Sequence, residues 1–335
     1  MPAGPPAQPT AGAGGSAAAP AGAPSRLTMG TSSSTSSYYA YNVALARLLQ
    51  SKVPGLNVTV SEGGGTSLNA TLMRDDKIDF SLAGFAALYL PYAGLDPAWQ
   101  EKPFQDARTL WLFDPAAQVW YVREDSGVTT IEQLNGKEFS PGGKGSATEV
   151  IATKLAFPAI GVQPKWYTGG YDDALTAMKD KRIVGTGKAT AIARPDALIQ
   201  DAMVSMKIRI LSWTPEQIQK AKEKYPFLST TEIPAGVYKA DWNEKPITTW
   251  QDGIGMFTRA KFSNDVAYAF TKAAVEDNKE GGEQVQSSAF TAMKGADLVK
   301  LTMDLATVPL HAGSYKYFSE IGVQIPDRLK PPEVK

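Results

Sequence analysis

The chain has 335 residues, of which 43% are hydrophobic and 20% are charged, a composition typical of folded globular proteins. The 34 Lys and Arg residues balance the 34 Asp and Glu residues, so no overall positive field favours binding of nucleic acid. The absence of cysteine excludes disulfides, thiolate metal sites and cysteine nucleophiles. With His311 as the only histidine, histidine metal sites and Ser-His-Asp catalysis are poor fits.

The length indicates more than one structural unit. A chain of 335 residues is about twice the ~150 residues of a typical domain, which predicts two lobes or one large domain with insertions. Two lobes would leave a cleft between them. No run of about 18 apolar residues occurs, so no membrane-spanning helix is predicted.

Residues 1–26 are rich in Pro, Ala, Gly and Ser and carry no aromatic or large aliphatic side chain after Met1. Such a segment cannot bury enough surface to offset its ordering entropy, so a disordered linker is predicted. It lacks the basic and apolar regions of a signal peptide. Two interpretations remain: a tether left after removal of a signal peptide, or a flexible extension of a cytoplasmic protein.

The first ordered segment predicts alternating strands and helices. Residues 26–52 indicate a short strand, a Ser/Thr/Gly loop and a helix from about Tyr38, with Leu45, Leu48 and Leu49 on one face. An alternating strand then ends at Gly63–Gly65 and is followed by a helix and another strand. This order predicts a parallel sheet with both loops at the carboxyl ends of its strands, where ligand sites lie.

The middle of the chain predicts a second α/β lobe. Residues 109–115 and 117–125 are expected to form a strand pair, and residues 126–163 a short helix, a strand, a loop and a longer helix. Further on, a strand, a helix and another strand precede a Gly/Thr/Lys loop and a helix after Pro195. The plan of the first lobe is thus repeated.

The last segment is expected to return to the first lobe. From Trp250 the pattern predicts a strand and a helix capped by Ser263, then further helices, so the chain would cross between the lobes twice. The predicted division is a linker at 1–26, lobe 1 at 27–120 plus 248–330, and lobe 2 at 121–247.

Three loops are candidate anion sites. The GTSSSTSS loop at 30–37 presents hydroxyls and backbone N–H groups at a helix N-terminus, where a carboxylate is favoured. Gly63–Gly65 with Thr66 would let the backbone approach a ligand, and the GGKGSAT loop at 142–148 offers a second set of amides. The alternative for each loop is ordinary helix capping or a simple turn. Dinucleotide and Walker spacings are absent, so nucleotide binding is not favoured.

Cations and aromatic side chains complete the predicted site. Lys188 and Arg194 lie in a strand-to-helix region of the second lobe, where they could pair with a carboxylate, although most such residues are solvated surface charges. Aromatic side chains could line an apolar wall or form plain core. His311 is expected to be structural. The candidate ligand-binding residues are Thr31, Ser32, Ser33, Ser34, Thr35, Tyr38, Tyr39, Gly64, Thr66, Phe85, Trp120, Ser146, Ala147, Thr148, Lys188 and Arg194.

Five stretches, taken in order, resemble the signature regions of TAXI-type substrate-binding proteins of tripartite TRAP transporters. They are GTSSSTSSYYAYNVALARLL, VTVSEGGGTSLNATLMRDDKIDFSLAG, SPGGKGSATEVIATKLAFPAIGV, YDDALTAMKDKRI and VPLHAGSYKYFSEIG. The likeness covers residues 27–322. Two departures bear on ligand preference: serines replace glycines of the family's first loop, and Lys188 and Arg194 are added to its second-lobe loop.

The resemblance implies a periplasmic-binding-protein type II fold, with two α/β lobes joined by a two-crossing hinge and a ligand cleft between them. It implies a periplasmic, monomeric protein without cofactor or metal. Such a protein captures a small organic carboxylate, either an amino acid or a dicarboxylate such as glutamate or 2-oxoglutarate, and delivers it to TRAP permease subunits.

Two rival functions remain at the level of sequence. One is a receptor for a neutral or aromatic solute that serves an ABC transporter or a sensor kinase. The other is an enzyme on the same fold, in which Asp172, Asp173 or Asp196 would act as acid or base. Capping at helix starts explains these aspartates equally well, and no cofactor motif accompanies them, so no enzyme activity is expected.

Overall fold

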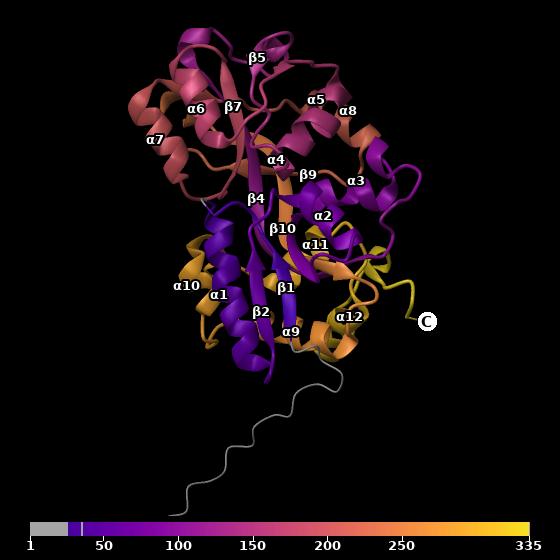
Figure 1. Ribbon diagram of the computed structural model, residues 1–335. Helices are drawn as coiled ribbons and strands as arrows, with labels where there is room; N and C mark the ends of the chain where they lie inside the picture. The colour runs from indigo at the N-terminus through magenta and orange to yellow at the C-terminus, as the bar shows by residue number, and fades with distance from the viewer. Residues whose placement is uncertain (1–25, 35, 335) are drawn as a thin grey trace, which may run out of the picture.

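The computed structural model describes residues 26–34 and 36–334, which form two α/β halves joined by one continuous sheet (Figure 1). The sheet has eight strands in the order β2-β1-β3-β10-β4-β7, with β8 beside β4 and β9 beside β10. A separate two-stranded sheet pairs β5 (Glu138–Phe139) with β6 (Lys165–Trp166). The α/β class predicted from the sequence is therefore confirmed.

The first half begins with a βαβαβ unit, as the sequence predicts. Its elements are β1 (Arg26–Gly30), α1 (Ser37–Lys52), β2 (Asn57–Ser61), α2 (Thr66–Arg74), β3 (Phe80–Gly84) and α3 (Phe85–Ala93). β2 and β3 both pair with β1 in parallel. The predicted apolar face of α1 is confirmed, because Leu45, Leu48 and Leu49 are buried against the sheet. Arg26, predicted to belong to the linker, is the first residue of β1.

Two long antiparallel strands, β4 (Ala107–Arg123) and β10 (Ile247–Arg259), run through both halves. At one end β10 pairs with β3, and at the other β4 pairs with β7 (Gly185–Thr190). The predicted break between two strands near Pro115 is wrong. Proline lacks an N–H donor and is tolerated in a strand only where no partner needs that donor. β7 pairs with β4 only from Ala117 onward, so one edge of β4 has no strand partner at Pro115 and the strand continues through it.

The second half is built between these two strands. Its helices are α4 (Ala147–Val150), a π-helical segment (Ile151–Ala156), α5 (Phe157–Ile160), α6 (Tyr171–Lys179), α7 (Ala197–Ser205) and α8 (Pro215–Lys224), and its short strands are β8 (Ile208–Ile210) and β9 (Ser229–Ile233). Two apolar clusters form its core, one around Trp120, Phe157 and Trp213 and the other around Tyr121 and Met178. The lobe boundaries at 120/121 and 247/248 fall inside β4 and β10 and stay a prediction.

The C-terminal helices pack back on the first half, as predicted. They are α9 (Asn264–Asn278), α10 (Val285–Ala289), α11 (Leu298–Leu305) and α12 (Ala312–Glu320). Ser263 caps α9 by accepting a hydrogen bond from Val266 N. Short 3₁₀ turns occur at Pro97–Trp99, Glu124–Ser126, Glu132–Leu134, Asp241–Asn243, Thr291–Met293 and Asp327–Leu329. None of the helices in the described ranges is long and apolar enough to cross a membrane.

His311 has the structural role predicted for it. Its Nδ1 accepts a hydrogen bond from Gly313 N at 3.1 Å, which caps α12, so Nε2 carries the proton and donates to Phe262 O at 3.0 Å. Burial lowers the pKa of the imidazole to about 4. The ring is therefore neutral at physiological pH and fixes the start of α12 against the loop before α9.

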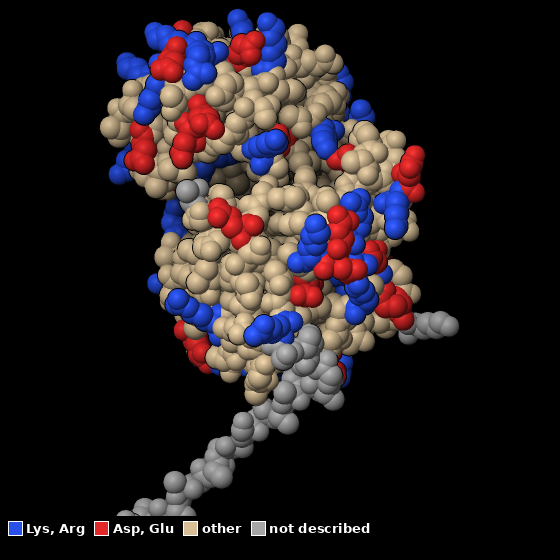
Figure 2. Space-filling view, in the orientation of Figure 1, with Lys and Arg blue, Asp and Glu red and all other residues tan. Residues whose placement is uncertain are grey.

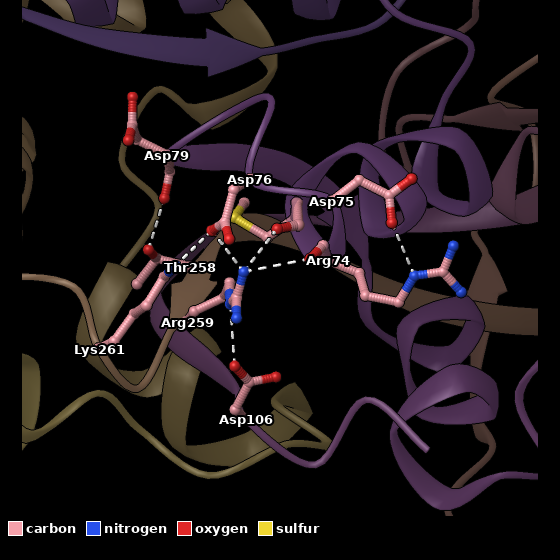
Figure 3. Close-up of polar contacts among 9 residues, drawn as sticks. Arg74, Asp75, Asp76, Asp79, Asp106, Thr258, Arg259 and Lys261 are labelled. Carbon is pink, nitrogen blue, oxygen red and sulfur yellow. Dashed lines mark hydrogen bonds and ion pairs between the residues drawn. The ribbon is translucent and has the colours of Figure 1, made fainter. Parts of the chain in front are cut away.

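Arg259, at the end of β10, anchors the end of α2 (Figure 3). Its Nη1 donates to the carbonyls of Met73 and Arg74 at 3.1 and 3.2 Å and to Asp76 at 2.5 Å, and its Nε donates to Asp106 at 2.8 Å. These carbonyls belong to the last turn of the helix and have no partner within it. Arg259 thus ties the C-terminus of α2 to the crossing strand.

Candidate ligand site between the two halves

The first half offers a switch point in its sheet, between β1 and its two neighbours. The strand order β2-β1-β3 places the loop after β1 beside the loop after β2, since Gly30 is in register with Ser61. Thr31 N donates to Ser61 O at 3.1 Å, and Gly63 N donates to Ser32 O at 3.3 Å. The prediction that the two loops meet at the carboxyl ends of the strands is confirmed, and such a switch point is where ligands bind in α/β folds.

Several hydroxyls of the first loop are already occupied. Thr31 is fully buried, and its Oγ1 accepts a hydrogen bond from Asn42 Nδ2. Ser34 donates from its backbone N–H and its hydroxyl to Glu62, at 2.7 and 2.9 Å, and these bonds lower the pKa of that carboxyl. The structure therefore contradicts the prediction that Ser34 offers free donors to a ligand, because Glu62 accepts both of them, and Thr31 is buried with Asn42 of α1 as its partner.

The remaining members of the first loop lie near the interface between the halves. Ser33 is exposed, and the Ser32 hydroxyl is buried without a partner among the described residues. Ser36, which belongs to the loop predicted to bind an anion, caps α1 by accepting from Tyr38 N at 3.3 Å. The predicted site residue Thr35 lies outside the described residues.

The glycine loops of the two halves touch. A Cβ placed on Gly65 would lie 2.6 Å from Gly145 O, and one placed on Gly145 would lie 2.2 Å from Gly64 O. Both Gly65 and Gly145 have positive φ, at 90° and 79°. Gly64, predicted as a ligand contact, is therefore a contact between the halves, and only glycine permits so close a backbone approach.

The loop before α4 faces the first half as predicted, but its polar groups bond within the protein. Ser146 caps α4 by accepting from Glu149 N at 3.1 Å, and Thr148 Oγ1 donates to Gln118 Oε1 at 2.6 Å. Thr66 is 4% exposed and accepts from Gly84 N at 2.9 Å. The capping interpretation therefore holds for Ser146, and neither threonine hydroxyl is free.

Two of the predicted aromatic wall residues belong to the core. Phe85 and Trp120 are fully buried, and the Trp120 ring packs against Phe157 and Trp213, with centroids 5.3 and 5.8 Å apart. Neither presents a surface to the space between the halves, so their assignment to the ligand wall is wrong. Tyr39 and Ala147 are half-buried, and Ala147 packs against Gly84 of the first half.

Tyr38 connects α1 to β4 at the junction of the halves. Its hydroxyl donates to Asp114 Oδ2 at 2.7 Å. Burial, together with the carboxylates of Asp114, Asp252 and Asp196, raises the pKa of this hydroxyl well above its usual range. Asp196 belongs to the second half, so the Tyr38 hydroxyl lies where the two halves meet.

Sequence reasoning missed Asp114 and Asp252, which lie on the two crossing strands. They are 5% and 1% exposed. Burial raises the pKa of Asp114 to about 6, although the hydrogen bond from Tyr38 and the charge of Arg194 oppose the shift. Burial, with a contribution from Asp114, also raises the pKa of Asp252 to about 7. Each aspartate lies inside an otherwise apolar run, Asp114 in WLFDP and Asp252 in WQDGIGMF. This pattern is the sequence signal from which both could have been predicted.

The two predicted cations reach the junction from the second half. Lys188, on β7, forms an ion pair with Asp196, and burial lowers the pKa of its ammonium. Asp196 also accepts from Ile199 N and so caps α7. Arg194, in the loop before α7, donates from Nη2 to Thr291 O of the first half at 2.5 Å, so its guanidinium spans the two halves.

The surface is hollowed between the halves, and Lys or Arg side chains lie on the wall of the hollow (Figure 2). At the junction of the halves, hydrogen bonds and electrostatic interactions link Arg194, Lys188, Tyr38, Asp114 and Asp196. Within the described residues no group of three His, Asp or Glu side chains is arranged to hold a metal ion. The arrangement suits an organic ion that carries hydrogen-bonding groups.

Asp172 and Asp173, the other candidate acids of the enzyme interpretation, lie in the first turn of α6. The Asp173 carboxylate accepts from Gly170 N at 3.0 Å. Asp196 caps α7 and is paired with Lys188. Helix capping therefore explains the positions of both Asp173 and Asp196.

Solved structures share this fold at low sequence identity. A Xanthomonas citri protein solved bound to ATP is 11% identical, with a TM-score of 0.50 and coverage of 89% of this chain and 100% of that chain. A Bordetella bronchiseptica RB50 protein is 16% identical, with a TM-score of 0.50 and coverage of 91% of each chain. The GluR0 ligand-binding core of Nostoc punctiforme, solved with L-glutamate, is 12% identical, with a TM-score of 0.48 and coverage of 80% and 98%.

The fold is that of type II periplasmic-binding proteins, as the sequence predicts: two α/β halves, a mixed sheet and two crossing strands. The sequence also matches a family description over residues 29–322, which is most of the chain. This match leads to a plain assignment: the chain belongs to the NMT1-like family.

Proposed function

We propose that this protein is the extracytoplasmic solute-binding component of a TRAP transporter of the TAXI type. It captures a small organic carboxylate, an amino acid or a dicarboxylate, between its two halves and delivers it to the membrane permease. The observation that carries the proposal is the position of Arg194, whose guanidinium extends from the second half to the carbonyl of Thr291 in the first half.

Arg194 suits a carboxylate because its guanidinium presents parallel N–H donors to two oxygens. One of these donors is bonded to the backbone carbonyl of Thr291, which is a neutral acceptor. A ligand carboxylate is a stronger acceptor, since charge-assisted hydrogen bonds are about twice as strong as neutral ones. We therefore expect the ligand to replace Thr291 O as the partner of Arg194.

Lys188 has a different role from that of Arg194. Its ammonium is paired with Asp196 and lies 5.7 Å from the ring centroid of Tyr171. Because its charge is already compensated, it contributes less to attraction of an anion and more to the shape of the site. This ranks Arg194 ahead of Lys188 as the ligand-binding cation.

The family resemblance supports the transporter assignment, and the two-half fold supports ligand capture by closure. A ligand shifts the balance between open and closed forms only by its differential affinity for the closed form. A ligand that binds Arg194 of the second half in place of Thr291 O, and also contacts the first half, would gain that difference only when the halves are close. The Xanthomonas citri protein of similar fold was solved bound to ATP, an organic anion.

A thermal-shift screen of the full chain against amino acids, dicarboxylates, keto acids and neutral solutes tests the proposal. A ligand that binds only the folded state raises Tm according to RT ln(1 + [L]/Kd). The expected result is a shift with organic acids that Arg194→Ala reduces, with affinity lower by roughly 10- to 100-fold, as expected for a lost charge-assisted bond. The matched control is Arg182→Ala, an exposed arginine of the same half.

A response to neutral or aromatic solutes alone, with none to acids, would contradict the carboxylate proposal and favour the rival receptor function. Turnover of a candidate acid during incubation would instead favour an enzyme.

A further inference from the structure

Asp114 and Asp252 form a buried carboxyl pair where the crossing strands pass from one half to the other. Asp252 is opposite Ala116 on β4, and Asp114 is opposite Ile254 on β10. The register is regular over these positions, so the two aspartates are diagonal neighbours on one face of the sheet. A change in the charge of this pair acts directly on the two strands that join the halves.

The pair has little to compensate two negative charges. Asp114 accepts one hydrogen bond from Tyr38, and Asp252 Oδ1 accepts one from Ala86 N at 2.8 Å. Asp252 Oδ2 is buried and has no hydrogen-bond partner among the described residues. It lies against Gly84, where an added Cβ would be 2.3 Å from it. Neither carboxylate takes part in an ion pair within the ranges that the structure describes.

The charged and titratable groups that act on the pair come from three elements. α1 contributes the Tyr38 hydroxyl, which bonds to Asp114. The loop before α7 contributes Arg194, whose charge favours the ionised form of Asp114. Lys188 of β7 is paired with Asp196, which acts on the Tyr38 hydroxyl rather than directly on either carboxyl. A ligand that binds Arg194 can therefore change the electrostatic effect of this cation on the pair.

We propose that capture of the organic acid is coupled to uptake of protons from solvent by the Asp114–Asp252 pair. This inference rests on the proposed function, because it needs a carboxylate bound to Arg194. The ligand stays ionised, and the proton that the pair gains comes from the buffer. Arg194 stabilises a negative charge on Asp114. A bound carboxylate cancels that field and adds a negative charge of its own, so the pair retains a proton that it otherwise loses.

The titration range of the pair makes this coupling relevant near neutrality. The pKa of Asp114 is about 6 and that of Asp252 about 7, both raised chiefly by burial. The charge of Asp114 raises the pKa of Asp252, so the titrations of the two carboxyls are linked. At pH 7 the pair is partly ionised, which leaves room for proton uptake when the ligand arrives.

Isothermal titration calorimetry of the full chain tests the inference. L-Glutamate and 2-oxoglutarate are each titrated at pH 7 in buffers of different ionisation enthalpy, and the dependence of the observed heat on the buffer gives the protons taken up. We expect uptake of roughly 0.2–0.8 proton per ligand bound, and an affinity that falls by up to about tenfold per pH unit between pH 7 and pH 8.

The variants are Asp114→Asn and Asp252→Asn, each of which keeps an oxygen to accept the existing hydrogen bond. Both are expected to reduce the uptake and flatten the pH dependence of the affinity. If one variant fails to fold, the other still tests the pair. Asp304→Asn is the matched control, because Asp304 is an exposed aspartate on α11 that pairs with Lys300. It should leave proton uptake unchanged.

Binding without proton uptake, binding with proton release, or uptake that persists in both variants would each overturn the inference and leave the proposed function intact. Failure of every acid to bind between pH 5.5 and pH 8 would overturn the proposed function, and the inference with it. The two failures are therefore distinguishable.

Discussion

Gly65 of the first half and Gly145 of the second half are in direct backbone contact, so closely that a Cβ on Gly65 would lie 2.6 Å from the Gly145 carbonyl oxygen. Heavy atoms cannot approach to that distance without displacement. The close position of the two halves therefore depends on the absence of side chains at these loops.

Gly145→Ala should hold the halves apart. Its Cβ would lie 2.2 Å from Gly64 O, and its φ of 79° also disfavours any residue with a side chain. We expect ligand affinity to fall by at least about tenfold, since about 1.4 kcal/mol of closing free energy is one decade in affinity. Isothermal titration calorimetry and small-angle scattering measure affinity and closure. Gly143→Ala is the control, because nothing lies within 4 Å of its added Cβ; equal behaviour of the two variants would contradict the prediction.

Tyr89 and Phe227 join the two halves at a second place. Their ring centroids are 4.3 Å apart, Tyr89 on α3 of the first half and Phe227 after α8 of the second. A double-mutant cycle with Tyr89→Ala and Phe227→Ala should give a coupling of about 0.5–1.5 kcal/mol in the free energy of unfolding. Urea denaturation followed by fluorescence measures it. A coupling of zero would show that the rings do not stabilise the closed form in solution.

The buried carboxyl of Asp252 predicts a pH dependence of stability. Its folded-state pKa of about 7 is above the value of an unfolded aspartate, so the folded state binds the proton more tightly. That advantage is complete below about pH 3.8 and is lost as pH rises through 7. Asp252→Asn should therefore raise stability relative to the natural protein at pH 8, by on the order of 2 kcal/mol, and much less at pH 5. Chemical denaturation at both pH values checks this; a difference independent of pH would contradict it.

Arg259 predicts a stability effect at the far end of the first half. Arg259→Met removes a donor from the carbonyls of Met73 and Arg74 at the end of α2, and it leaves Asp106 without its ion-pair partner. This change should cost about 2 kcal/mol in the free energy of unfolding. Lys261→Met is the matched control, because Lys261 pairs with the same Asp76 but is 60% exposed, and such surface pairs contribute less than about 1 kcal/mol. Urea denaturation of both variants measures the difference. Similar losses would contradict the role assigned to Arg259.

Local signals explain what the sequence predicted well. The buried leucines of α1 and the Ser263 cap of α9 follow from patterns within a few residues of one another. The order of strands and helices in the first half follows from the same kind of pattern. The continuity of β4 through Pro115 does not, because it depends on pairing with β10, more than 130 residues further along the chain.

The candidate site was harder to predict, since its bonds join distant segments. The hydroxyl of Ser34 matches an anion site in sequence, but it is bound to Glu62 of the neighbouring loop. Arg194 was predicted from the sequence and stays a candidate, while its contact with Thr291 depends on the folding of the C-terminal helices onto the first half. The pairing of Asp114 with Asp252 across adjacent strands carries no signal in the local sequence beyond a charge within an apolar run.

The route of the chain through β4 and β10 has a consequence for how ligand preference can evolve in proteins with this fold. The chain leaves the first half along β4 and returns along β10, its hydrogen-bonded neighbour, so residues 124–246 form an excursion whose two ends lie on adjacent strands. Lengthening, trimming or exchanging that excursion leaves the connectivity of the first half unchanged. Ligand preference can therefore diverge in one contiguous stretch of gene while the framework that receives it stays constant, and a transplanted 124–246 segment should carry its own cations with it.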